Sequence, residues 1–262
     1  MIREPLNIIK VGGAIVENEE SLDALLMSFS SLKGYKILVH GGGRTATDIA
    51  SRLGIETQMI DVRRITSAEM LKVVTMVYGG LVNKNLVARL QALGVNAIGL
   101  TGADMNIIMS VKRPVELVNF GFVGDVKYVN VRALKSLLEA GAVPVLAPLT
   151  HNKEGVMLNT NADTIASEVA QALASEYYVT LTYCSDMPGV LADVNDPTSV
   201  IKTIFEKDFE PMVADGTISA GMIPKLQNAF EAIDSGVSKV VITSASDLTG
   251  GTSIQTDLES DD

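Results

Sequence analysis

The sequence has few of the residues that build metal centres and covalent cross-links. Its 262 residues include one cysteine, two histidines and no tryptophan. A single cysteine allows no internal disulfide, and no cluster of His and Cys suggests a zinc site, so we predict no protein-bound metal. Cys184 follows an apolar stretch and is interpreted as a small buried thiol. Neither His40 nor His151 stands in a pattern typical of Ser-His-Asp or Cys-His catalysis.

Long hydrophobic runs and an excess of positive charge are also lacking. No apolar run approaches the roughly 18–20 residues of a membrane span, and the start of the chain lacks the apolar stretch of a signal peptide. We therefore expect a cytoplasmic protein. The 31 acidic residues outnumber the 21 basic ones, which gives a formal net charge of −10 at pH 7. Such a chain repels phosphate backbones and has no dense run of Lys and Arg, so we expect no nucleic-acid or membrane partner.

The sequence does contain β-rich apolar runs that alternate with helical stretches. With 47% hydrophobic residues it has enough apolar material for a packed core, which excludes intrinsic disorder. Strands are expected at 7–11, 36–39, 97–100, 143–149, 178–183, 240–243 and 252–255, and helices at 19–33, 44–53, 131–140, 161–174 and 230–234. A hairpin or small antiparallel sheet is expected within 106–129. The alternation predicts an α/β protein whose open sheet carries helices on its faces.

A longer helix is expected between Thr66 and Gly94. Thr66 and Glu69 fit a capping box, in which the first residue caps the helix and the fourth reaches back to it. Gly94 is a typical C-terminal stop, and Gly79-Gly80 marks a weak point within the helix. The strand pattern starts again near residue 175, so we divide the chain into residues 1–175 and 176–262.

Three glycine-rich turns follow predicted strands. They are Gly12-Gly13, Gly41-Gly42-Gly43 at the start of a helix, and the segment from Asp186 to Gly189. Glycine lets the backbone approach a ligand closely, and N–H groups at a helix start attract anions. Each turn alone could be no more than a chain reversal. No Walker loop is present, and the second turn fails the dinucleotide fingerprint at its last glycine, so we predict anion binding of another kind.

Charged residues stand near these turns in unusual places. Lys10 lies in an apolar strand, and burial of an unpaired ammonium is costly, so Lys10 should meet an anion unless it reaches solvent from an edge strand. Lys225 follows Pro224 in the first turn of a helix, where a cation opposes the helix dipole. It is either a solvated surface lysine or the partner of an anionic ligand.

A polar group precedes the helix predicted at 161–174. Leu158-Asn159-Thr160-Asn161-Ala162-Asp163 offers two amides and a carboxylate, and capping needs one of them. An Asp that holds two lysines and an Asn that bonds a polar substrate would account for the others. Arg63-Arg64 precedes the helix at Thr66, and an Arg that meets a carboxylate through two hydrogen bonds is a common recognition device.

These motifs together resemble the acetylglutamate kinases, within the amino-acid kinase superfamily. The resemblance covers nearly the whole chain and lies in IIKVGGA (8–14), LVHGGG (38–43), RRIT (63–66), GLTGAD (99–104), PVLAPL (144–149), LNTNAD (158–163), SDMPGVL (185–191) and ISAGMIPKL (218–226). It implies a three-layer αβα sandwich with a mainly parallel open sheet. Residues 1–175 would form an N-terminal lobe for the acylated amino acid and dimerisation, and residues 176–262 a C-terminal lobe for ATP.

The resemblance also implies a reaction and a set of site residues. MgATP would phosphorylate the γ-carboxylate of an N-acyl-L-glutamate, N-acetylglutamate in the second step of arginine biosynthesis. Lys10 and Lys225 would bracket the transferred phosphoryl group, and Asp163 would hold both lysines. The substrate would meet Gly42, Gly43, Arg63, Arg64 and Asn159, and the nucleotide would meet Gly12, Gly13, Asp186, Met187, Pro188, Gly189, Val190, Leu191, Thr217 and Ser219.

Departures from the family pattern leave alternatives open. Val62-Arg63 replaces the usual Gly-Leu and adds a cation, which suggests that the acyl group itself carries charge, as in N-succinylglutamate. Another acceptor of the superfamily (carbamate, glutamate, aspartate or uridylate) is a second alternative, and a non-catalytic sensor on the same fold is a third. Arginine-inhibited relatives carry an additional N-terminal helix. Lys10 lies too near the start of this chain for one, so we expect an arginine-insensitive homodimer.

Overall fold

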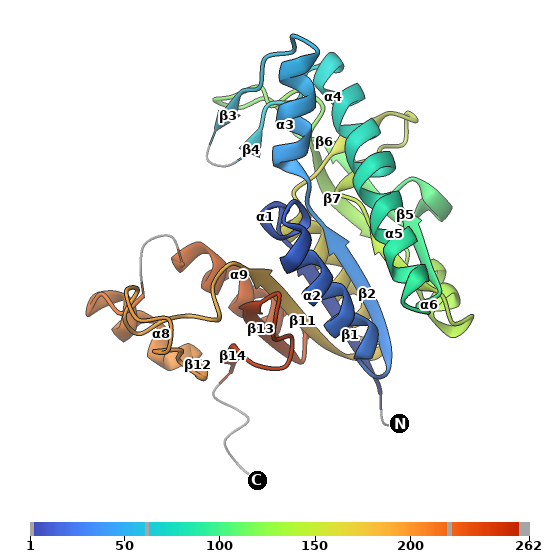
Figure 1. Ribbon diagram of the computed structural model, residues 1–262. Helices are drawn as coiled ribbons and strands as arrows, with labels where there is room; N and C mark the ends of the chain where they lie inside the picture. Colours follow the sequence, from blue (N-terminus) through green and yellow to red (C-terminus); the bar gives the residue numbers. More distant parts are fainter. Residues whose placement is uncertain (1–2, 61–62, 219–221, 257–262) are drawn as a thin grey trace.

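An eight-stranded sheet runs through the computed structural model (Figure 1), which describes residues 3–60, 63–218 and 222–256. In spatial order its strands are β12 (Thr203–Phe205), β14 (Thr252–Gln255), β13 (Lys239–Ser244), β11 (Tyr177–Ser185), β1 (Glu4–Val11), β2 (Tyr35–His40), β8 (Val143–Leu146) and β5 (Ala97–Leu100). The neighbours from β13 to β5 pair in parallel, whereas β14 runs antiparallel to β13 and parallel to β12. The predicted α/β class with a mainly parallel open sheet is confirmed.

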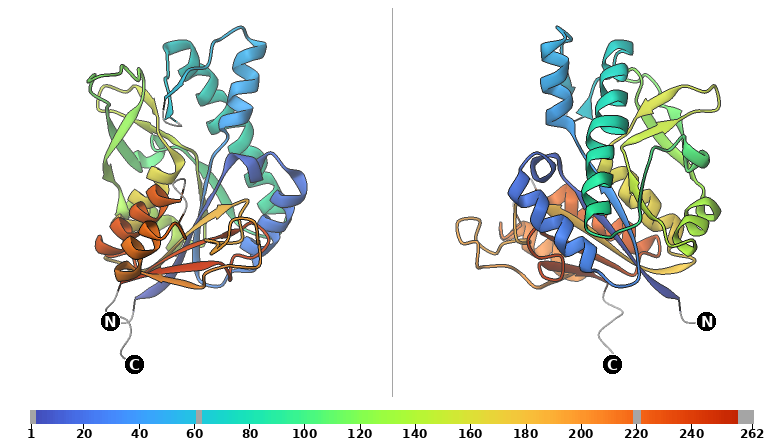
Figure 2. Two further views of the ribbon diagram at one scale, coloured as in Figure 1. Left: turned by 90° about the vertical axis from the view of Figure 1, so that its left-hand side faces the viewer. Right: turned by 45° about the vertical axis from the view of Figure 1, so that its right-hand side comes forward.

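Helices cover both faces of this sheet, which makes three layers. One face packs against α6 (Val131–Glu139), α7 (Ala162–Leu173), α8 (Glu206–Ala214) and α9 (Ile223–Asp234). The other face packs against α2 (Glu19–Ser31), α3 (Gly43–Arg52) and the long helix described below, and the four-residue α1 (Gly13–Val16) follows β1. In the left view of Figure 2, α9 (red) and α2 (blue) lie on opposite sides of the sheet. The helix expected to include 230–234 is α9, which begins at Ile223 and so has Lys225 in its first turn, as the sequence predicted.

Alternation along the central strands decides which face each side chain joins. On β1, Leu6 and Ile8 belong to the core on the α7 side, whereas Ile9 and Val11 belong to the core on the α2 side. Because successive side chains of a strand point to opposite faces, Lys10 falls on the α7 side. By the same alternation, His40 at the end of β2 falls on the opposite side. These two assignments determine which helices the two polar residues meet.

The helix predicted between Thr66 and Gly94 is present with two differences. It consists of α4 (Ala68–Val74), the π-helical segment η1 (Thr75–Val82) and α5 (Asn83–Ala92), so the weak point at Gly79-Gly80 lies in π geometry. The cap is Ser67, whose Oγ accepts the Met70 N–H at 3.1 Å. The capping box predicted at Thr66 is wrong by one residue, because the Thr66 hydroxyl is buried and engaged by Asn159 at 3.0 Å.

Two smaller sheets lie beyond the carboxyl ends of β2 and β8. One contains β10 (Met157–Asn159), β9 (Leu149–His151), β6 (Ile108–Lys112) and β7 (Gly124–Val129), and the other contains β3 (Met59–Ile60) and β4 (Arg63–Arg64). The antiparallel pair β6–β7 is the hairpin expected within 106–129. The strand expected at 143–149 is instead two strands, because the chain leaves the large sheet after β8 and joins the smaller one as β9. A short 3₁₀ turn, η2 (Asp104–Asn106), precedes β6.

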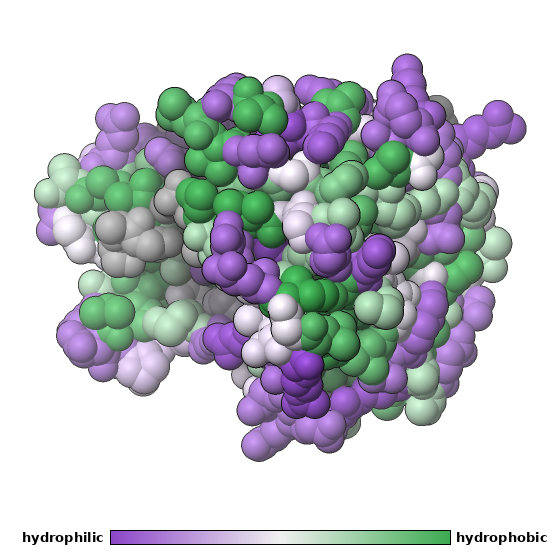
Figure 3. Space-filling view, turned by 90° about the horizontal axis from the view of Figure 1, so that it is seen from above, coloured by the Kyte–Doolittle hydropathy of each residue, from purple (hydrophilic) through white to green (hydrophobic). Residues whose placement is uncertain are grey.

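The described segments contain no helix that is long and apolar enough to cross a membrane. The face seen from above carries hydrophilic residues between hydrophobic ones (Figure 3). Residue 175, the predicted division between lobes, lies between α7 and β11, and β11 pairs with β1 in the middle of the large sheet. The sheet is therefore continuous across that position, and the division itself stays a prediction.

Candidate functional site

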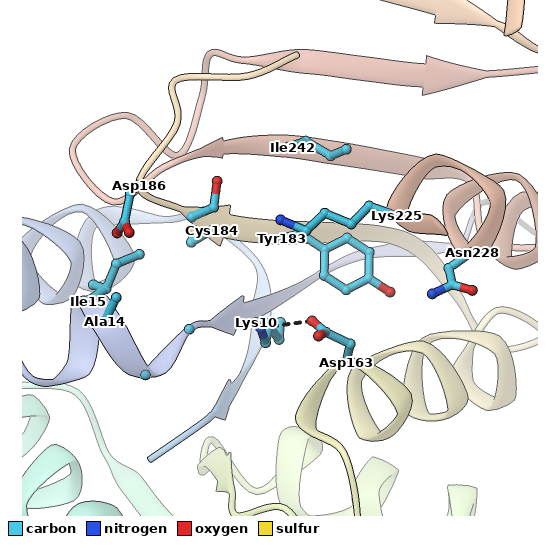
Figure 4. Close-up of a pocket in the computed structure, with 13 residues that line it drawn as sticks. Lys10, Ala14, Ile15, Asp163, Tyr183, Cys184, Asp186, Lys225, Asn228 and Ile242 are labelled. Carbon is cyan, nitrogen blue, oxygen red and sulfur yellow. Dashed lines mark ion pairs between the residues drawn. The ribbon is translucent and has the colours of Figure 1, made fainter. Parts of the chain in front are cut away.

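An ion pair stands at the carboxyl end of the central strand. The Lys10 Nζ lies 2.8 Å from the Asp163 Oδ1, and the Lys10 side chain is 15% exposed (Figure 4). Asp163 lies in the first turn of α7, the helix that covers the face to which Lys10 points. Asn161 caps this helix by accepting the Asp163 N–H at 2.7 Å, which leaves the Asp163 carboxylate available to Lys10. The anion that the sequence predicted for Lys10 is thus present within the protein.

A pocket of about 230 Å³ opens on the β11 side of this pair. It lies at the carboxyl ends of β1, β11 and β13, where open α/β sheets commonly bind ligands. Lys225 reaches it from the first turn of α9 (Figure 4), and no carboxylate of the described residues pairs with that ammonium. Its other lining residues include Gly12, Gly13, Tyr183, Cys184 and Asp186. Two ammonium groups and two glycines therefore border one cavity.

The floor of this pocket is formed by groups that stay neutral. Burial raises the pKa of the Cys184 thiol to about 12, although Lys10 nearby acts in the opposite direction. Burial, and to a lesser extent the Asp163 carboxylate, raises the pKa of the Tyr183 phenol. Neither group ionises near pH 7, so the positive charge of the lysines is not offset by the strand that lies beneath them. The interpretation of Cys184 as a buried thiol is confirmed.

A second pocket of about 210 Å³ lies on the other side of the same ion pair. Lys10 and Asp163 line both pockets. The second is also bordered by predicted substrate-binding residues and by others that the sequence did not single out: Gly41, Gly42, Gly43, Arg63, Arg64, Tyr78, Arg113 and Asn159. Two cavities of similar size thus meet at one lysine and one carboxylate.

Arg64 is a buried cation at this second pocket. Its side chain is 8% exposed, and its Nη2 donates to the Gly43 carbonyl at 2.8 Å and to the Thr47 hydroxyl at 2.9 Å. No carboxylate of the described residues forms an ion pair with it, although a buried charge is stable only when it is paired or well bonded. An anionic ligand in this pocket would supply the missing charge.

Asn159 and Arg113 approach the second pocket from the smaller sheet. Asn159 ends β10, is 8% exposed and donates its Nδ2 proton to the Thr66 hydroxyl at 3.0 Å. Arg113 follows β6, and its Nε donates to the Asp125 Oδ1 at 2.9 Å. Arg113 was not predicted from the sequence. Its position depends on how the hairpin β6–β7 folds back, and the only local signal is an arginine before a proline at a strand end.

The two N-terminal glycine turns lie against each other. A Cβ at Gly13 would stand 3.6 Å from the Gly43 nitrogen and 3.7 Å from the Gly42 nitrogen. Gly42 has a φ of +149°, a conformation that L side chains rarely adopt, and a Cβ there would meet the Tyr78 ring at 3.2 Å. The structure therefore places these turns at the junction of the two pockets, and it requires glycine at Gly42.

The other residues predicted to contact the nucleotide do not all line the first pocket. Asp186 lines the first pocket, whereas Val190 and Leu191 are buried and a Cβ at Gly189 would lie 2.7 Å from the Thr252 hydroxyl. The structure gives Met187, Pro188 and Thr217 no place in the lining of either pocket. Ser219 lies outside the described residues. The contacts of this group with a nucleotide stay a prediction.

No set of protein ligands for a metal ion gathers in the part of the chain that the structure describes. Groups of three or more His, Cys, Asp or Glu side chains with suitable spacing are absent from residues 3–60, 63–218 and 222–256. Asp163, the carboxylate at the junction, is held by Lys10.

Comparisons of the sequence with known proteins identify one family. The model of the amino acid kinase family matches residues 5–244. The chain is 64% identical to the acetylglutamate kinase of Phocaeicola vulgatus, over 95% of this chain and 97% of that protein, and 60% identical to that of Bacteroides fragilis, over 97% and 98%. It is 41% identical to the acetylglutamate kinase of Methanopyrus kandleri, over 94% of this chain and 98% of that protein.

Solved structures share the fold. The protein smu.665 of Streptococcus mutans matches with a TM-score of 0.77 and 29% identity, over 95% of this chain and 98% of that one. An N-acetylglutamate synthase of Neisseria gonorrhoeae, complexed with coenzyme A and N-acetyl-glutamate, matches with a TM-score of 0.77. Its identity is 20%, over 97% of this chain and 60% of that one, so this likeness concerns the fold alone.

Proposed function

We propose that the chain transfers a phosphoryl group from ATP to N-acetyl-L-glutamate, because it belongs to the amino acid kinase family and its relatives there include acetylglutamate kinases. The acceptor atom is an oxygen of the γ-carboxylate, and the product is an acyl phosphate. Within arginine biosynthesis this is the second step. ATP enters with Mg²⁺ bound to its phosphate oxygens, because such ions are commonly held by substrate phosphates and few protein groups.

One observation supports this reaction above others, namely that two pockets share Lys10 and Asp163. A phosphoryl transfer needs two anionic substrates in line, with positive charge between them. The pocket beside β11 suits the triphosphate, since Lys10 and Lys225 border it. The pocket beside Arg64 suits the acyl amino acid. Residues 1–175 would then bind the acceptor and residues 176–262 the nucleotide.

The reaction needs from the protein mainly the positioning of the two substrates and positive charge beside them. A carboxylate is already ionised at pH 7, so no general base is needed. The Lys10 ammonium stabilises the negative charge on the transferred phosphoryl group, and Lys225 does so from the nucleotide side. Asp163 holds the Lys10 ammonium through their 2.8 Å ion pair. It acts as a positioning residue for that ammonium.

Substrate orientation comes from the second pocket. Arg64 lacks a carboxylate partner, and its planar guanidinium matches the α-carboxylate of the acceptor through two hydrogen bonds. Asn159 presents an amide beside it. The Gly42 and Gly43 N–H groups lie where the two pockets meet and bond the oxygens of the γ-carboxylate or the phosphoryl group. The Gly12 and Gly13 N–H groups do the same from β1.

Trapping the acyl phosphate tests the proposal. The protein is incubated with MgATP and each candidate acceptor in the presence of hydroxylamine, which converts an acyl phosphate to a coloured hydroxamate. The panel contains N-acetylglutamate, glutamate, aspartate, carbamate and UMP, and a coupled assay measures ADP release with each, because phosphorylated UMP is a phosphoanhydride that hydroxylamine does not trap. Hydroxamate is expected with N-acetylglutamate and not with glutamate. A wild-type protein that phosphorylates none of the panel would favour the sensor instead.

A second candidate acceptor is N-succinyl-L-glutamate, and the number of arginines supports it. Arg63, Arg64 and Arg113 all line the second pocket, and Asp125 pairs with Arg113, so two arginines without a carboxylate partner stand where one α-carboxylate needs one. Arg63 forms no ion pair within the described part of the chain. A succinyl group carries a second carboxylate that Arg63 would bind.

Steady-state comparison of the two acceptors decides between them. If succinyl is the natural group, kcat/KM is higher for N-succinylglutamate, and Arg63→Ala lowers it for that acceptor while leaving N-acetylglutamate nearly unaffected. A clear preference of the wild type for N-acetylglutamate rejects this candidate. The KM for ATP serves as the internal control, because Arg63 lies away from the nucleotide pocket.

The remaining expectations from the sequence belong to the same proposal. The protein is cytoplasmic and forms a homodimer. Sizing chromatography coupled to light scattering measures the oligomer. A monomer or a hexamer would contradict the expected dimer.

A further inference from the structure

His40 is buried at the point where β2 meets the second glycine turn. It is the last residue of β2, its side chain is 0% exposed, and Gly41 follows it directly. The ring contacts two polar groups: its Nδ1 lies 2.7 Å from the Gly41 carbonyl oxygen, and its Nε2 lies 3.1 Å from the Asn83 Nδ2. The reaction proposed above assigns no role to this residue, because its ring lines neither pocket.

The partners of Asn83 determine which ring nitrogen carries the proton. Asn83 is 1% exposed and begins α5. Its Oδ1 accepts the Lys84 ammonium at 3.1 Å, and its Nδ2 donates to the Val145 carbonyl at 2.9 Å. The amide can therefore offer His40 only an N–H group, and the Nε2 must accept it. The ring proton is then on Nδ1, which donates it to the Gly41 oxygen.

The Gly41 oxygen belongs to the same planar unit as the Gly42 nitrogen. In a trans peptide the C=O and the N–H point in opposite directions, so an anchored oxygen fixes the direction of the N–H. A peptide unit between two glycines has little steric resistance to rotation and needs such an anchor. The Gly42 N–H donates no hydrogen bond within the described part of the chain, and Gly42 lines the second pocket.

We propose that His40 is a positioning residue, held in one tautomer by Asn83, that aims the Gly42 N–H at the oxygens that receive or carry the phosphoryl group. This inference rests on the proposed function and adds to it a positioning residue that lines neither substrate pocket. A Cβ at Gly99 would stand 1.9 Å from the Asn83 Oδ1, so the glycine of the neighbouring strand β5 leaves room for this amide. The network thus links β2, α5, β8 and β5 to one peptide unit.

The ring performs this task without a charge. Burial lowers the pKa of His40 to about 4; the hydrogen bond with the Gly41 carbonyl acts in the opposite direction, and the nearby Lys84 ammonium lowers the pKa further. At neutral pH the ring is a neutral donor and acceptor, which matches the two contacts that it makes. A histidine that merely filled space would not need Asn83 in one orientation, and this difference allows a test.

The decisive variants are Asn83→Asp and Asn83→Leu. Aspartate has the shape of asparagine but offers His40 an acceptor, so at an assay pH at which the ring stays neutral the proton moves to Nε2 and the Gly41 oxygen loses its donor. We expect kcat to fall about tenfold or more in Asn83→Asp, as for the loss of one preorganised donor, with the KM for ATP within about twofold of the wild type. Asn83→Leu removes the constraint without reversing it and should give a smaller loss of kcat.

Leu90→Ala is the matched control. Leu90 is fully buried on the same helix, and its truncation destabilises the fold without touching the His40 network. We expect a lower unfolding temperature and an unchanged kcat. If Asn83→Asp, being nearly isosteric, keeps the kcat of the wild type, the positioning role is overturned. If the wild type phosphorylates no acylglutamate at all, the proposed function is overturned instead.

Nuclear magnetic resonance reads the tautomer without any variant. The chain contains two histidines, and His151→Gln leaves the ring nitrogens of His40 alone in a long-range ¹H–¹⁵N spectrum. We expect a protonated Nδ1 and an unprotonated Nε2 at neutral pH, with the assignment reversed in Asn83→Asp. A wild-type ring that carries its proton on Nε2 would overturn the inference, whether or not the variants fold.

Discussion

Acidification should destabilise the protein through His40 well before most carboxylates are protonated. The imidazole has an ordinary pKa near 6.5, and burial lowers it to about 4 in the folded protein. Between these two values the unfolded chain binds a proton that the folded chain rejects, so the free energy of unfolding falls as the pH falls. Above about pH 6.5 the ring is neutral in both states and contributes no slope.

The size of the effect follows from the two pKa values. Each pH unit within that window costs about 1.4 kcal/mol, so a change from pH 7 to pH 5 removes about 2 kcal/mol. The full loss at acid pH is about 3 kcal/mol. Glu168 acts in the opposite direction, because its burial raises its pKa and the folded chain binds that proton first. A comparison with a variant that lacks His40 cancels this contribution.

Urea unfolding at pH 7, 6 and 5 measures the slope for the wild type and for His40→Gln. The wild type should lose about 2 kcal/mol more than the variant over this range. His151→Gln is the control and should follow the wild type, because it retains the buried ring. Direct titration of the His40 resonances provides a measurement that needs no stable variant. A His40 ring that becomes protonated near pH 6.5 in the folded protein would refute the reasoning.

Further predictions concern other residues of the site. Lys10→Met should lower kcat at least a hundredfold in the hydroxamate assay, and a loss below tenfold would contradict its role. Circular dichroism should stay unchanged, since the Asp163 carboxylate left without its partner is half exposed. Arg64→Lys should raise the KM for the acylglutamate about tenfold and leave that for ATP unchanged, because an ammonium cannot form two parallel bonds; an unaltered acceptor KM argues against the contact. Gly42→Ala should lower the free energy of unfolding by about 1–3 kcal/mol in urea, because its φ is +149°, whereas no loss would mean that the turn relaxes. Cys184 should resist iodoacetamide at pH 8 until urea unfolds the chain, given its burial and a pKa of about 12; rapid alkylation of the folded protein would disprove this.

Local signals in the sequence indicated the two partners of the ion pair at the centre of the site, and the family resemblance implied their contact. A lysine in an apolar strand needs a partner, and an aspartate two residues after a helix cap is free to be that partner. The contact of Asp163 with Lys225, which the resemblance also implied, is not among the ion pairs of the described residues. The order of the strands could not be predicted in this way, because apolar periodicity is the same for neighbours that run parallel and antiparallel.

Contacts between segments far apart in the sequence were not predictable. Asn83 lies 43 residues from His40, and its approach depends on how α5 packs on the sheet. Arg113 reaches the second pocket only because the hairpin β6–β7 folds over it. The capping box was misplaced for a related reason: the Thr66 hydroxyl looked available in the sequence, but Asn159 engages it from β10. In each case the deciding partner belongs to another layer of the fold.

The π-helical segment between α4 and α5 sets the direction in which the side chains of α5 point. Each residue of an α-helix turns the chain by about 100°, so the wider turn over Thr75–Val82 changes the direction in which everything after it points. If the same residues adopted ordinary α geometry, with one residue fewer in the wide turn, α5 would be rotated by about that angle relative to α4. Asn83 would then turn away from His40, and Leu86 and Leu90 would leave the core together. The π geometry of this segment therefore keeps α5 in contact with the glycine turn, and a substitution that favoured a regular α-helix there would disconnect them.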